Sequence, residues 1–571
     1  MEKNKKSFIK GAAILGVAGL IVKIIGAFYR IPLTNILQRG DLDGMIFYAT
    51  AYPYYSWLLV ISSAGFPTAI SKLVSERVAL GDKKGATAVF KTALRLLVMI
   101  GIVTTVIMFA CSGLIADLAD VPGARLSIMA LAPALLVVSV MCAYRGYLQG
   151  MQLMTGTALS QVTEQVGKLI ASYSLAILFV KLYPTRPDLW AMGTLIGISI
   201  SEVMGLAVIW FIYRRSRRNL PSYGFEDLTV SKSAFRSIGK SLLAIAVPIT
   251  IGASIMPITG IADTIFIKRL LTLRYTSLGF GAELAGDMAG DGFVALRSYV
   301  TPLINMPAVL TLALSMSLVP AIAPMRAAHD RRGIRKVGIT GMKLAMLIGA
   351  PCAAGLFVLG APIMAILFNK VGDSTDTYYI SGFIGRILNM SPGNEPSIYD
   401  IAGGIMQISA IGVLFLSLVQ TLTGVIQGMG KQKVPVYFLI AGGIVKVVSM
   451  VVLMRFTRLG VLGAAVSTVL CYIVAGIGDT YYTIQHADIR FSWFDVFGKP
   501  ILASVIMGVC VYFVYGLIYR LGHPTLATFG SVLIGIAVYV VWLWLLRAFN
   551  KDDLEFMPAS RKLAKLFRIK K

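Results

Sequence analysis

The sequence predicts an all-α polytopic membrane protein with about 14 transmembrane helices. Of its 571 residues, 57% are hydrophobic and 14% are charged, and the mean hydropathy is +0.78. Soluble domains carry about 25% charged residues. Apolar runs of roughly 20 residues recur along the chain, each long enough to cross about 30 Å of hydrocarbon. Backbone groups in lipid must be satisfied within the segment, so continuous runs of this length are helices rather than barrel strands.

The expected helices are spread over the whole chain. The first follows a basic start, and we expect an uncleaved span because its apolar pattern continues past the length of a signal-peptide core without a small-residue cleavage site. The boundaries around Asp263 and Arg297 are the least sharply marked. The expected centres are Lys23, Leu59, Gly101, Leu136, Ser172, Ser201, Ser254, Val309, Gly355, Leu414, Val445, Val469, Ile506 and Val538.

The distribution of Lys and Arg predicts the orientation. Most of the 53 Lys and Arg residues fall in alternate loops that share a side with the basic amino terminus, among them "SERVALGDKKG", "YRRSRRNL" and "RAAHDRRGIRK". Cytoplasmic loops carry such an excess. We therefore expect a multi-pass protein of a bacterial plasma membrane with both termini in the cytoplasm. The net charge of +26 is explained by topology and attraction to anionic lipid, and no nucleic-acid partner is expected.

The sequence lacks the motifs of metal, redox or nucleotide chemistry. The five cysteines lie singly in or beside apolar runs, and the three histidines lie in loops or at helix ends. Neither set has the spacing of a disulfide framework or a metal site. We expect no enzyme activity, no catalytic residues, no metal and no cofactor. The residues concerned are Cys111, Cys142, Cys352, Cys471, Cys510, His329, His486 and His523.

An internal echo predicts the architecture. "RGYLQGMQ" from Arg145 is echoed by "TGVIQGMG" from Thr423, 278 residues later, and the same offset places Lys168 on Lys446. At slightly shorter offsets, Pro67 pairs with Pro320 and Asp82 with Asp330. We expect six-helix bundles over residues 1–225 and 226–490, two extra helices over 491–550 and a basic cytoplasmic tail over 551–571. The alternative is coincidental similarity among apolar segments.

A parallel repeat of this kind has functional meaning. An even number of spans separates equivalent points, so the halves share one orientation. Transporters are commonly built from such repeats, with the substrate held between them near mid-membrane and access alternating from side to side. The sequence therefore predicts a transporter.

The first apolar run, "GVAGLIVKIIGAFYRIPL", contains two cations. Gly16, Gly19, Lys23, Gly26 and Arg30 follow helical steps of three and four and share one face. A cation at the bilayer centre costs roughly 2.5 to 3.5 kcal/mol on insertion scales, so it usually faces a cavity or a partner. The alternatives are that Arg30 reaches the outer headgroups and that the glycines only pack helices closely.

The other intramembrane charges include further cations, Lys168, Arg297 and Lys446. Glu164 lies four residues before Lys168, the favoured order for a helical ion pair. Surplus positive charge suits an anionic substrate, and the Arg fork matches phosphate oxygens. The expected substrate-binding residues are Lys23, Arg30, Arg297 and Lys446. Secondary or ion-coupling candidates are Glu164, Lys168, Glu202 and Asp263.

Prolines and a polar segment suggest moving parts. Proline kinks a helix, so the first, second, seventh and eighth spans are candidates for gating, with simple kinks as the alternative. The segment from Leu271 to Gly292 is Gly-rich and too polar to span, and we expect an external mobile loop there. The prolines are Pro32, Pro53, Pro67, Pro248, Pro257, Pro302, Pro307 and Pro320.

Three long stretches carry a family resemblance. "KGAAILGVAGLIVKIIGAFYRIPL", "YPYYSWLLVISSAGFPTAISKLVSERVALGDKKG" and "YVTPLINMPAVLTLALSMSLVPAIAPM" resemble the polysaccharide-transport branch of the multidrug/oligosaccharidyl-lipid/polysaccharide exporter superfamily. Within it the sequence looks most like the stage V sporulation protein B and Gram-positive lipid II flippase group. The resemblance implies a flippase that moves undecaprenyl-diphosphate-linked saccharide, notably the peptidoglycan precursor lipid II, to the outer leaflet.

The resemblance also implies functional residues and partners. Arg30 and Arg297 match arginines of the first and eighth helices that hold the diphosphate, whereas the second-helix arginine has no obvious match. Ile31 stands where Gram-negative relatives often have an acidic residue. The expected partners are a polyprenyl-diphosphate-linked saccharide, membrane lipids and cell-wall synthesis proteins, with the chain a monomer. Transport would be driven by the membrane potential or an ion gradient.

Other functions stay open from sequence alone. A cation-coupled multidrug antiporter of the same superfamily could use Glu164, Glu202 and Asp263, but the surplus of cations argues against it. A membrane enzyme acting on the same lipids, or a scaffold for wall synthesis, is a further alternative. The sequence does not select the saccharide, or growth over sporulation.

Overall fold

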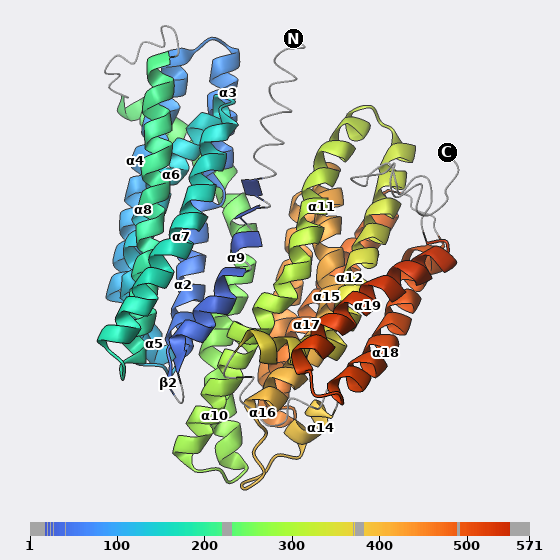
Figure 1. Cartoon of the computed structure of the whole chain (residues 1–571). Coiled ribbons are helices and arrows are strands. Elements are labelled where there is room, and N and C mark those ends of the chain that lie inside the picture. Colours follow the sequence, from blue (N-terminus) through green and yellow to red (C-terminus); the bar gives the residue numbers. More distant parts are fainter. Residues whose placement is uncertain are drawn as a thin grey trace. The chain divides into compact units, whose positions relative to one another are not determined.

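The computed structural model describes residues 18–39 without 20, 23 and 27, and residues 42–219, 231–368, 371, 382–487 and 492–548. In these residues, 13 helices are long and apolar enough to cross a membrane, and a shorter apolar helix covers Ile24–Leu37 (Figure 1). Each predicted centre from Leu59 to Val538 falls inside one of the 13. The named strands among the described residues are β1 (Gln38–Arg39) and β2 (Leu42–Asp43), which form one short hairpin. The predicted all-α membrane fold is confirmed.

The chain forms two compact units, Met1–Phe266 (unit 1) and Ile267–Lys571 (unit 2). The division falls inside α9 (Lys232–Ser277), and the predicted bundle boundaries near residues 225 and 490 stay predictions. In unit 1, α6 is central and packs against α2, α3, α4 and α8, while α7 packs along α8. The other helices of unit 1 are α2 (Met45–Ser63), α3 (Phe66–Ala79), α4 (Lys83–Ala110), α5 (Ser112–Leu118), α6 (Ala124–Gly150), α7 (Met154–Leu182) and α8 (Pro187–Asn219).

Unit 2 has α15 at its centre. This helix packs against α11, α12 and α17, while α16 packs along α17, and α18 and α19 pack against each other and against α12. The elements of unit 2 are α10 (Ala282–Val294), η1 (Ala295–Val300), α11 (Thr301–Ala327), α12 (Arg331–Leu367), α14 (Phe383–Leu388), α15 (Ile398–Gly428), α16 (Lys433–Phe456), α17 (Val461–His486), η2 (Phe494–Gly498), α18 (Lys499–Tyr519) and α19 (Pro524–Leu545).

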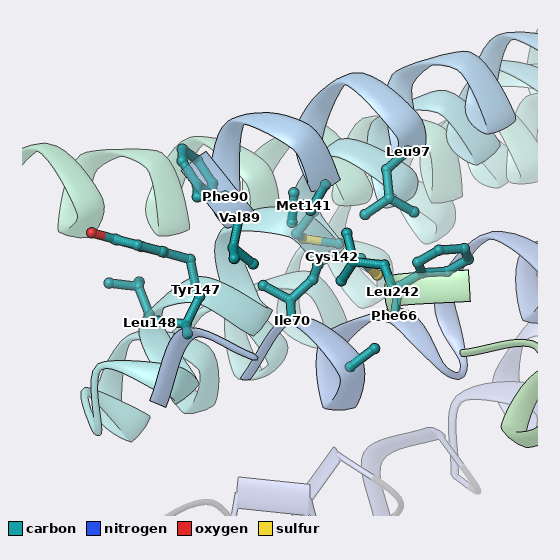
Figure 2. Packing of buried hydrophobic residues seen from close by; sticks show 14 of the residues in the cluster. Phe66, Ile70, Val89, Phe90, Leu97, Met141, Cys142, Tyr147, Leu148 and Leu242 are labelled. Carbon is teal, nitrogen blue, oxygen red and sulfur yellow. The ribbon is translucent and has the colours of Figure 1, made fainter. Parts of the chain in front are cut away.

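The second predicted span is broken into α2 and α3 at Gly65. A Cβ at Gly65 would overlap the backbone of Ala246 in α9, so only glycine allows this close approach. Pro67 lies in the first turn of the new helix, where its missing N–H costs nothing. Figure 2 shows the core that results, in which Phe66 and Ile70 of α3 meet side chains from α4, α6 and α9. Pro248 and Pro257, in contrast, lie inside α9, which continues through both.

The Asp82/Asp330 echo marks the same kind of helix start in both units. The Asp82 carboxylate accepts a hydrogen bond from Gly85 N at 2.7 Å, and Asp330 accepts one from Gly333 N at 2.9 Å. The Gly85 N–H and the Arg77 side chain lower the pKa of Asp82 from its ordinary 3.8. The cap therefore contributes its full stability at a pH above the ordinary pKa of 3.8. This contribution is lost as the pH falls through the lowered pKa of the folded protein.

The QGM echo marks the same helix end. After α6, Leu153 N donates to Leu148 O at 2.8 Å, and after α15, Lys431 N donates to Ile426 O at 3.1 Å. The residue in the left-handed region is Gln152 (φ 61°) in unit 1 and Gly430 (φ 74°) in unit 2. This conformation is unfavourable for a residue with a Cβ and favourable for glycine.

Replacing Gln152 with glycine is expected to stabilise the protein by about 1 kcal/mol, since it removes the left-handed strain at an exposed site. The opposite change, Gly430→Gln, should destabilise it. Thermal unfolding of the detergent-purified protein measures both. A lower melting temperature for Gln152→Gly would contradict the strain argument.

Three close helix approaches recur within each unit. Glycines of α6 contact α3 and glycines of α15 contact α11, while a glycine of α4 or α12 meets a serine of the following long helix. By this packing Pro67 corresponds to Ser315, five residues before the expected Pro320. The parallel arrangement of two six-helix repeats itself stays a prediction. The approaches in unit 1 are Gly146 to Pro67, Gly150 to Val74 and Gly101 to Ser139, and those in unit 2 are Gly424 to Ser315, Gly428 to Ile322 and Gly349 to Ser417.

The predicted mobile loop from Leu271 to Gly292 is wrong. Helix α9 continues to Ser277, and α10 begins at Ala282. Glu283 and Asp287 are exposed one turn apart, whereas Ala285 and Met288 are buried. Residues Ala282–Val294 form an amphipathic helix with small residues on its buried side. The prediction of a loop rested on the polarity and the glycine content of the segment.

Candidate functional site

Two cations and three tyrosines form a cluster in unit 1. The Arg30 Cζ lies 5.4 Å from the ring centroid of Tyr48 and 5.9 Å from that of Tyr52. The Lys168 Nζ lies 4.5 Å from the ring centroid of Tyr29 and 5.4 Å from that of Tyr52. We call these five residues the tyrosine–cation cluster. Both cations therefore lie against the Tyr52 ring, within the membrane-spanning part of the chain.

The hairpin after the first helix fixes where Arg30 lies along the neighbouring helix α2. Gln38 Nε2 donates to Asp43 Oδ2 at 2.8 Å, and Met45 N donates to Asp43 Oδ1 at 2.7 Å, so α2 starts directly after the turn. Arg30 lies about two turns before the first helix ends, and Tyr48 lies about one turn after α2 begins. The tight connection brings these positions side by side.

Stacked rings fix the shape of the cluster. Tyr48 and Tyr52, one turn apart on α2, stack with centroids 5.7 Å apart. Tyr173 of α7 stacks on Tyr29 at 5.4 Å with an interplanar angle of 8°, and its hydroxyl donates to the Tyr29 carbonyl at 2.6 Å. Tyr29 and Tyr48 are buried. The negative faces of such rings attract cations.

A carboxylate network lies beside the cluster. Arg145 of α6 forms a 2.8 Å ion pair with Glu164 of α7 and donates to Ser160 at 2.9 Å. Ser160 Oγ in turn donates to the Gly205 carbonyl of α8 at 3.0 Å. The network ties three helices together through polar groups that would be costly if left unsatisfied.

The helical ion pair that the spacing of Glu164 and Lys168 favours does not form. Both lie on α7 with helical spacing, but Glu164 binds Arg145 from the neighbouring helix, and Lys168 faces tyrosine rings. The sequence interpretation did not include Arg145 among the intramembrane charges. Its signal was an arginine at the end of an apolar run, inside the echoed "RGYLQGMQ".

Glu202 of α8 completes the set of charges in this region. It is 6% exposed, and its Oε2 accepts no hydrogen bond in the described part of the chain. It interacts electrostatically with Glu164, Arg145 and Lys168. With Arg30, the described residues of this region include three cations and two carboxylates, so positive charge is in surplus among them.

The remaining candidates lie elsewhere. Asp263 is buried on α9 of unit 1, and Lys446 is buried on α16 of unit 2. Arg297 lies in the π-helical turn η1, where Thr301 Oγ1 donates to the Leu296 carbonyl at 2.6 Å. Such single π-turns are frequent at functional sites. Lys23 lies outside the described residues.

The site resembles a binding site rather than a metal centre. No group of three or more His, Cys, Asp and Glu side chains in the described ranges is placed to hold a metal ion. What the structure brings together are a guanidinium, an ammonium and the faces of tyrosines. This arrangement can bind an anion that has apolar or ring-shaped neighbours.

Comparison with known proteins matches the chain to two family models and to bacterial membrane proteins. The family model described as Polysaccharide biosynthesis protein matches residues 8–326, and the MatE model matches residues 377–452. The uncharacterized membrane protein YabM of Bacillus subtilis is 27% identical over 98% of this chain and 96% of its own length. The lipid II flippase MurJ of Bacillus subtilis is 24% identical over 88% of this chain and 87% of its own length.

Solved structures give the same fold. An inward-facing multidrug resistance MATE transporter of the MOP superfamily matches with a TM-score of 0.63 and 14% identity, covering 82% of this chain and 94% of its own. The lipid II flippase MurJ in an inward closed conformation matches with a TM-score of 0.61 and 14% identity, covering 94% of this chain and 98% of its own.

Proposed function

The chain belongs to the polysaccharide biosynthesis protein family, and from this we propose that it flips a polyprenyl-diphosphate-linked saccharide. We further propose lipid II as the saccharide carrier, moved from the inner to the outer leaflet by alternating access. One of its relatives is a lipid II flippase, and the structure of a lipid II flippase has the same fold, which supports a transport role.

The tyrosine–cation cluster is the observation that carries this proposal. Arg30 and Lys168 both lie over the Tyr52 ring, and we assign one positive group to each of the two phosphates. The guanidinium can hold phosphate oxygens with two parallel hydrogen bonds, and the ammonium adds a mobile point charge. Intramembrane cations are costly unless a partner or cavity compensates them. A diphosphate that enters and leaves is such a partner.

A lipid-linked substrate also solves a transfer problem. A charged head group cannot cross hydrocarbon unaided, because desolvation without compensating hydrogen bonds is costly. Cations and tyrosine hydroxyls can replace part of the lost hydration while the polyprenyl tail stays in the bilayer. We propose that Arg297, in the π-turn η1, and Lys446 also contribute to substrate binding.

The second candidate is a cation-coupled multidrug antiporter. The MatE match to residues 377–452 and the MATE transporter fold favour it. Its coupling groups would be Glu164, Glu202 and Asp263. The ion pair of Glu164 with Arg145 and the surplus of cations fit a cationic drug less well than an anionic lipid.

Glu202 is our candidate for ion coupling in either function. Its carboxyl is buried and lies near Glu164, Arg145 and Lys168, so gain or loss of a proton would change the charge next to the cluster. We propose that an ion gradient or the membrane potential drives transport in a bacterial plasma membrane, with both termini cytoplasmic and the chain a monomer. Cell-wall synthesis proteins are proposed as further partners.

The proposal is tested by complementation. Bacterial cells depleted of their lipid II flippases should regain growth and lipid II exposed on the outer leaflet when they express this chain, measured by cleavage of lipid II with an enzyme confined to the outside. A Lys168→Ala variant that reaches the same membrane level as the wild-type chain is the control, since its failure to restore growth would not be due to poor expression. If the wild-type chain leaves exposed lipid II at the depleted level, the lipid II assignment is wrong.

A further inference from the structure

Unit 1 has a cavity whose lining includes none of the residues of the tyrosine–cation cluster. The cavity has a volume of about 610 Å³ and lies between α4 and the first turn of α9. This volume falls in the range of small-molecule sites. The lining residues are Leu94, Arg95, Val98 and Met99 of α4 and Lys232 and Phe235 of α9.

Lys232 is the first residue of α9, and Arg95 lies about three turns after α4 begins, where it lines the same cavity. Arg95 and Lys232 are exposed. Four crossing helices, α4, α6, α7 and α8, separate the start of α4 from the start of α9, so both starts lie on one side of the membrane. That side is the one where basic residues concentrate, which the positive-inside rule makes cytoplasmic.

Beyond the cavity, both helices expose further apolar side chains. On α4, Met99, Val103 and Val106 are more than half exposed, at 56%, 55% and 58%. On α9, Val247 and Ile251 are 45% and 56% exposed. Exposed apolar side chains at helical spacing on a spanning helix face lipid tails. A ligand with a charged head at Arg95 could therefore extend an apolar tail along this surface.

The corresponding face of α12 in unit 2 is covered by the chain itself. The shared caps and glycine contacts align Arg95 with Lys343 and Met99 with Leu347, 248 residues later. Helices α18 and η2 pack on α12, and Lys343 and Leu347 are only 4% and 7% exposed. Lys343 interacts electrostatically with Asp495 of η2. In unit 2 the chain thus supplies both an apolar cover and a negative charge.

We propose that the cavity between α4 and α9 binds one anionic phospholipid of the cytoplasmic leaflet as a resident lipid, distinct from the transported substrate. Its phosphate lies between Arg95 and Lys232, and an acyl chain follows Val98 and Met99. The lipid phosphate takes the place that Asp495 has in unit 2, and the acyl chain takes the place of α18. Anionic lipids of this leaflet are attracted to such basic groups.

Lipid binding can be measured on the purified full-length chain by native mass spectrometry with phosphatidylglycerol or phosphatidylcholine. We expect phosphatidylglycerol to remain bound at activation energies that remove phosphatidylcholine. Arg95→Ala/Lys232→Ala should weaken phosphatidylglycerol binding about tenfold or more, since two charge-assisted contacts are lost. The matched control Arg331→Ala/Arg332→Ala removes two exposed cations from the start of α12 and should leave binding unchanged.

A second variant separates the cavity from general surface charge. Val98→Trp keeps both cations but fills the apolar part, so it should also weaken phosphatidylglycerol binding. Unchanged binding by Val98→Trp, or equal losses in the two double variants, would overturn the proposal. Displacement of the lipid by equimolar inorganic phosphate would also overturn it, since the site would then recognise the phosphate alone. These readouts do not depend on transport.

Discussion

Replacing Arg30 with alanine is expected to abolish the rescue of flippase-depleted cells while the protein still accumulates in the membrane. Arg30 lies over the rings of Tyr48 and Tyr52, where its guanidinium can hold a phosphate with two hydrogen bonds. Charge-assisted bonds contribute roughly 1.5 to 3 kcal/mol each. Loss of two would weaken binding by roughly a hundredfold or more, because every 1.4 kcal/mol is a factor of ten.

The matched variants for this prediction are Arg30→Lys and Arg39→Ala. Arg30→Lys keeps the positive charge over the tyrosines but lacks the planar fork, so rescue should be poor. Arg39→Ala removes an exposed arginine from the adjacent hairpin and should leave rescue intact. Exposed lipid II and protein level are measured for each variant. Full activity of an Arg30→Ala/Arg297→Ala double variant would exclude both arginines from the site.

The span pattern could be predicted from sequence because hydrocarbon thickness imposes one length on every crossing helix. Leu59, Leu414 and Val538, for instance, each lie inside a helix of the expected kind. Local echoes were equally informative, because Asp82 and Asp330 cap helices in the same way. These features depend on neighbours in sequence or on solvent alone.

Partner choice across helices could not be predicted in the same way. Helical spacing paired Glu164 with Lys168, but the packing of α6 on α8 and of α7 on α8 gives Glu164 a better partner in Arg145. The sequence also did not predict that the tyrosines form part of a site. Tyr29 comes from the first helix and Tyr48 from α2, and only the hairpin between them shows that they are neighbours.

Replacing Arg145 with alanine is expected to produce the largest loss of stability. Its pair with Glu164 has a length of 2.8 Å, and the two side chains are only 11% and 17% exposed. Without Arg145, Glu164 loses its ion-pair partner and still lies close to Glu202. Breaking a buried pair costs about 3 to 5 kcal/mol, a large part of a total stability of about 5 to 15 kcal/mol. Thermal unfolding in detergent and monodispersity on gel filtration measure the loss.

Two comparison variants make the Arg145 prediction decisive. Arg186→Ala breaks a pair of the same 2.8 Å length with Asp188, but the Arg186 side chain is 57% exposed, so the melting temperature should change little. Arg145→Leu/Glu164→Leu removes both buried charges together and should recover most of the stability that Arg145→Ala loses, because no carboxylate is left uncompensated. If the double variant melts as low as Arg145→Ala, the loss arises from packing of the arginine stem on α6, and the network that joins α6, α7 and α8 is not held by charge.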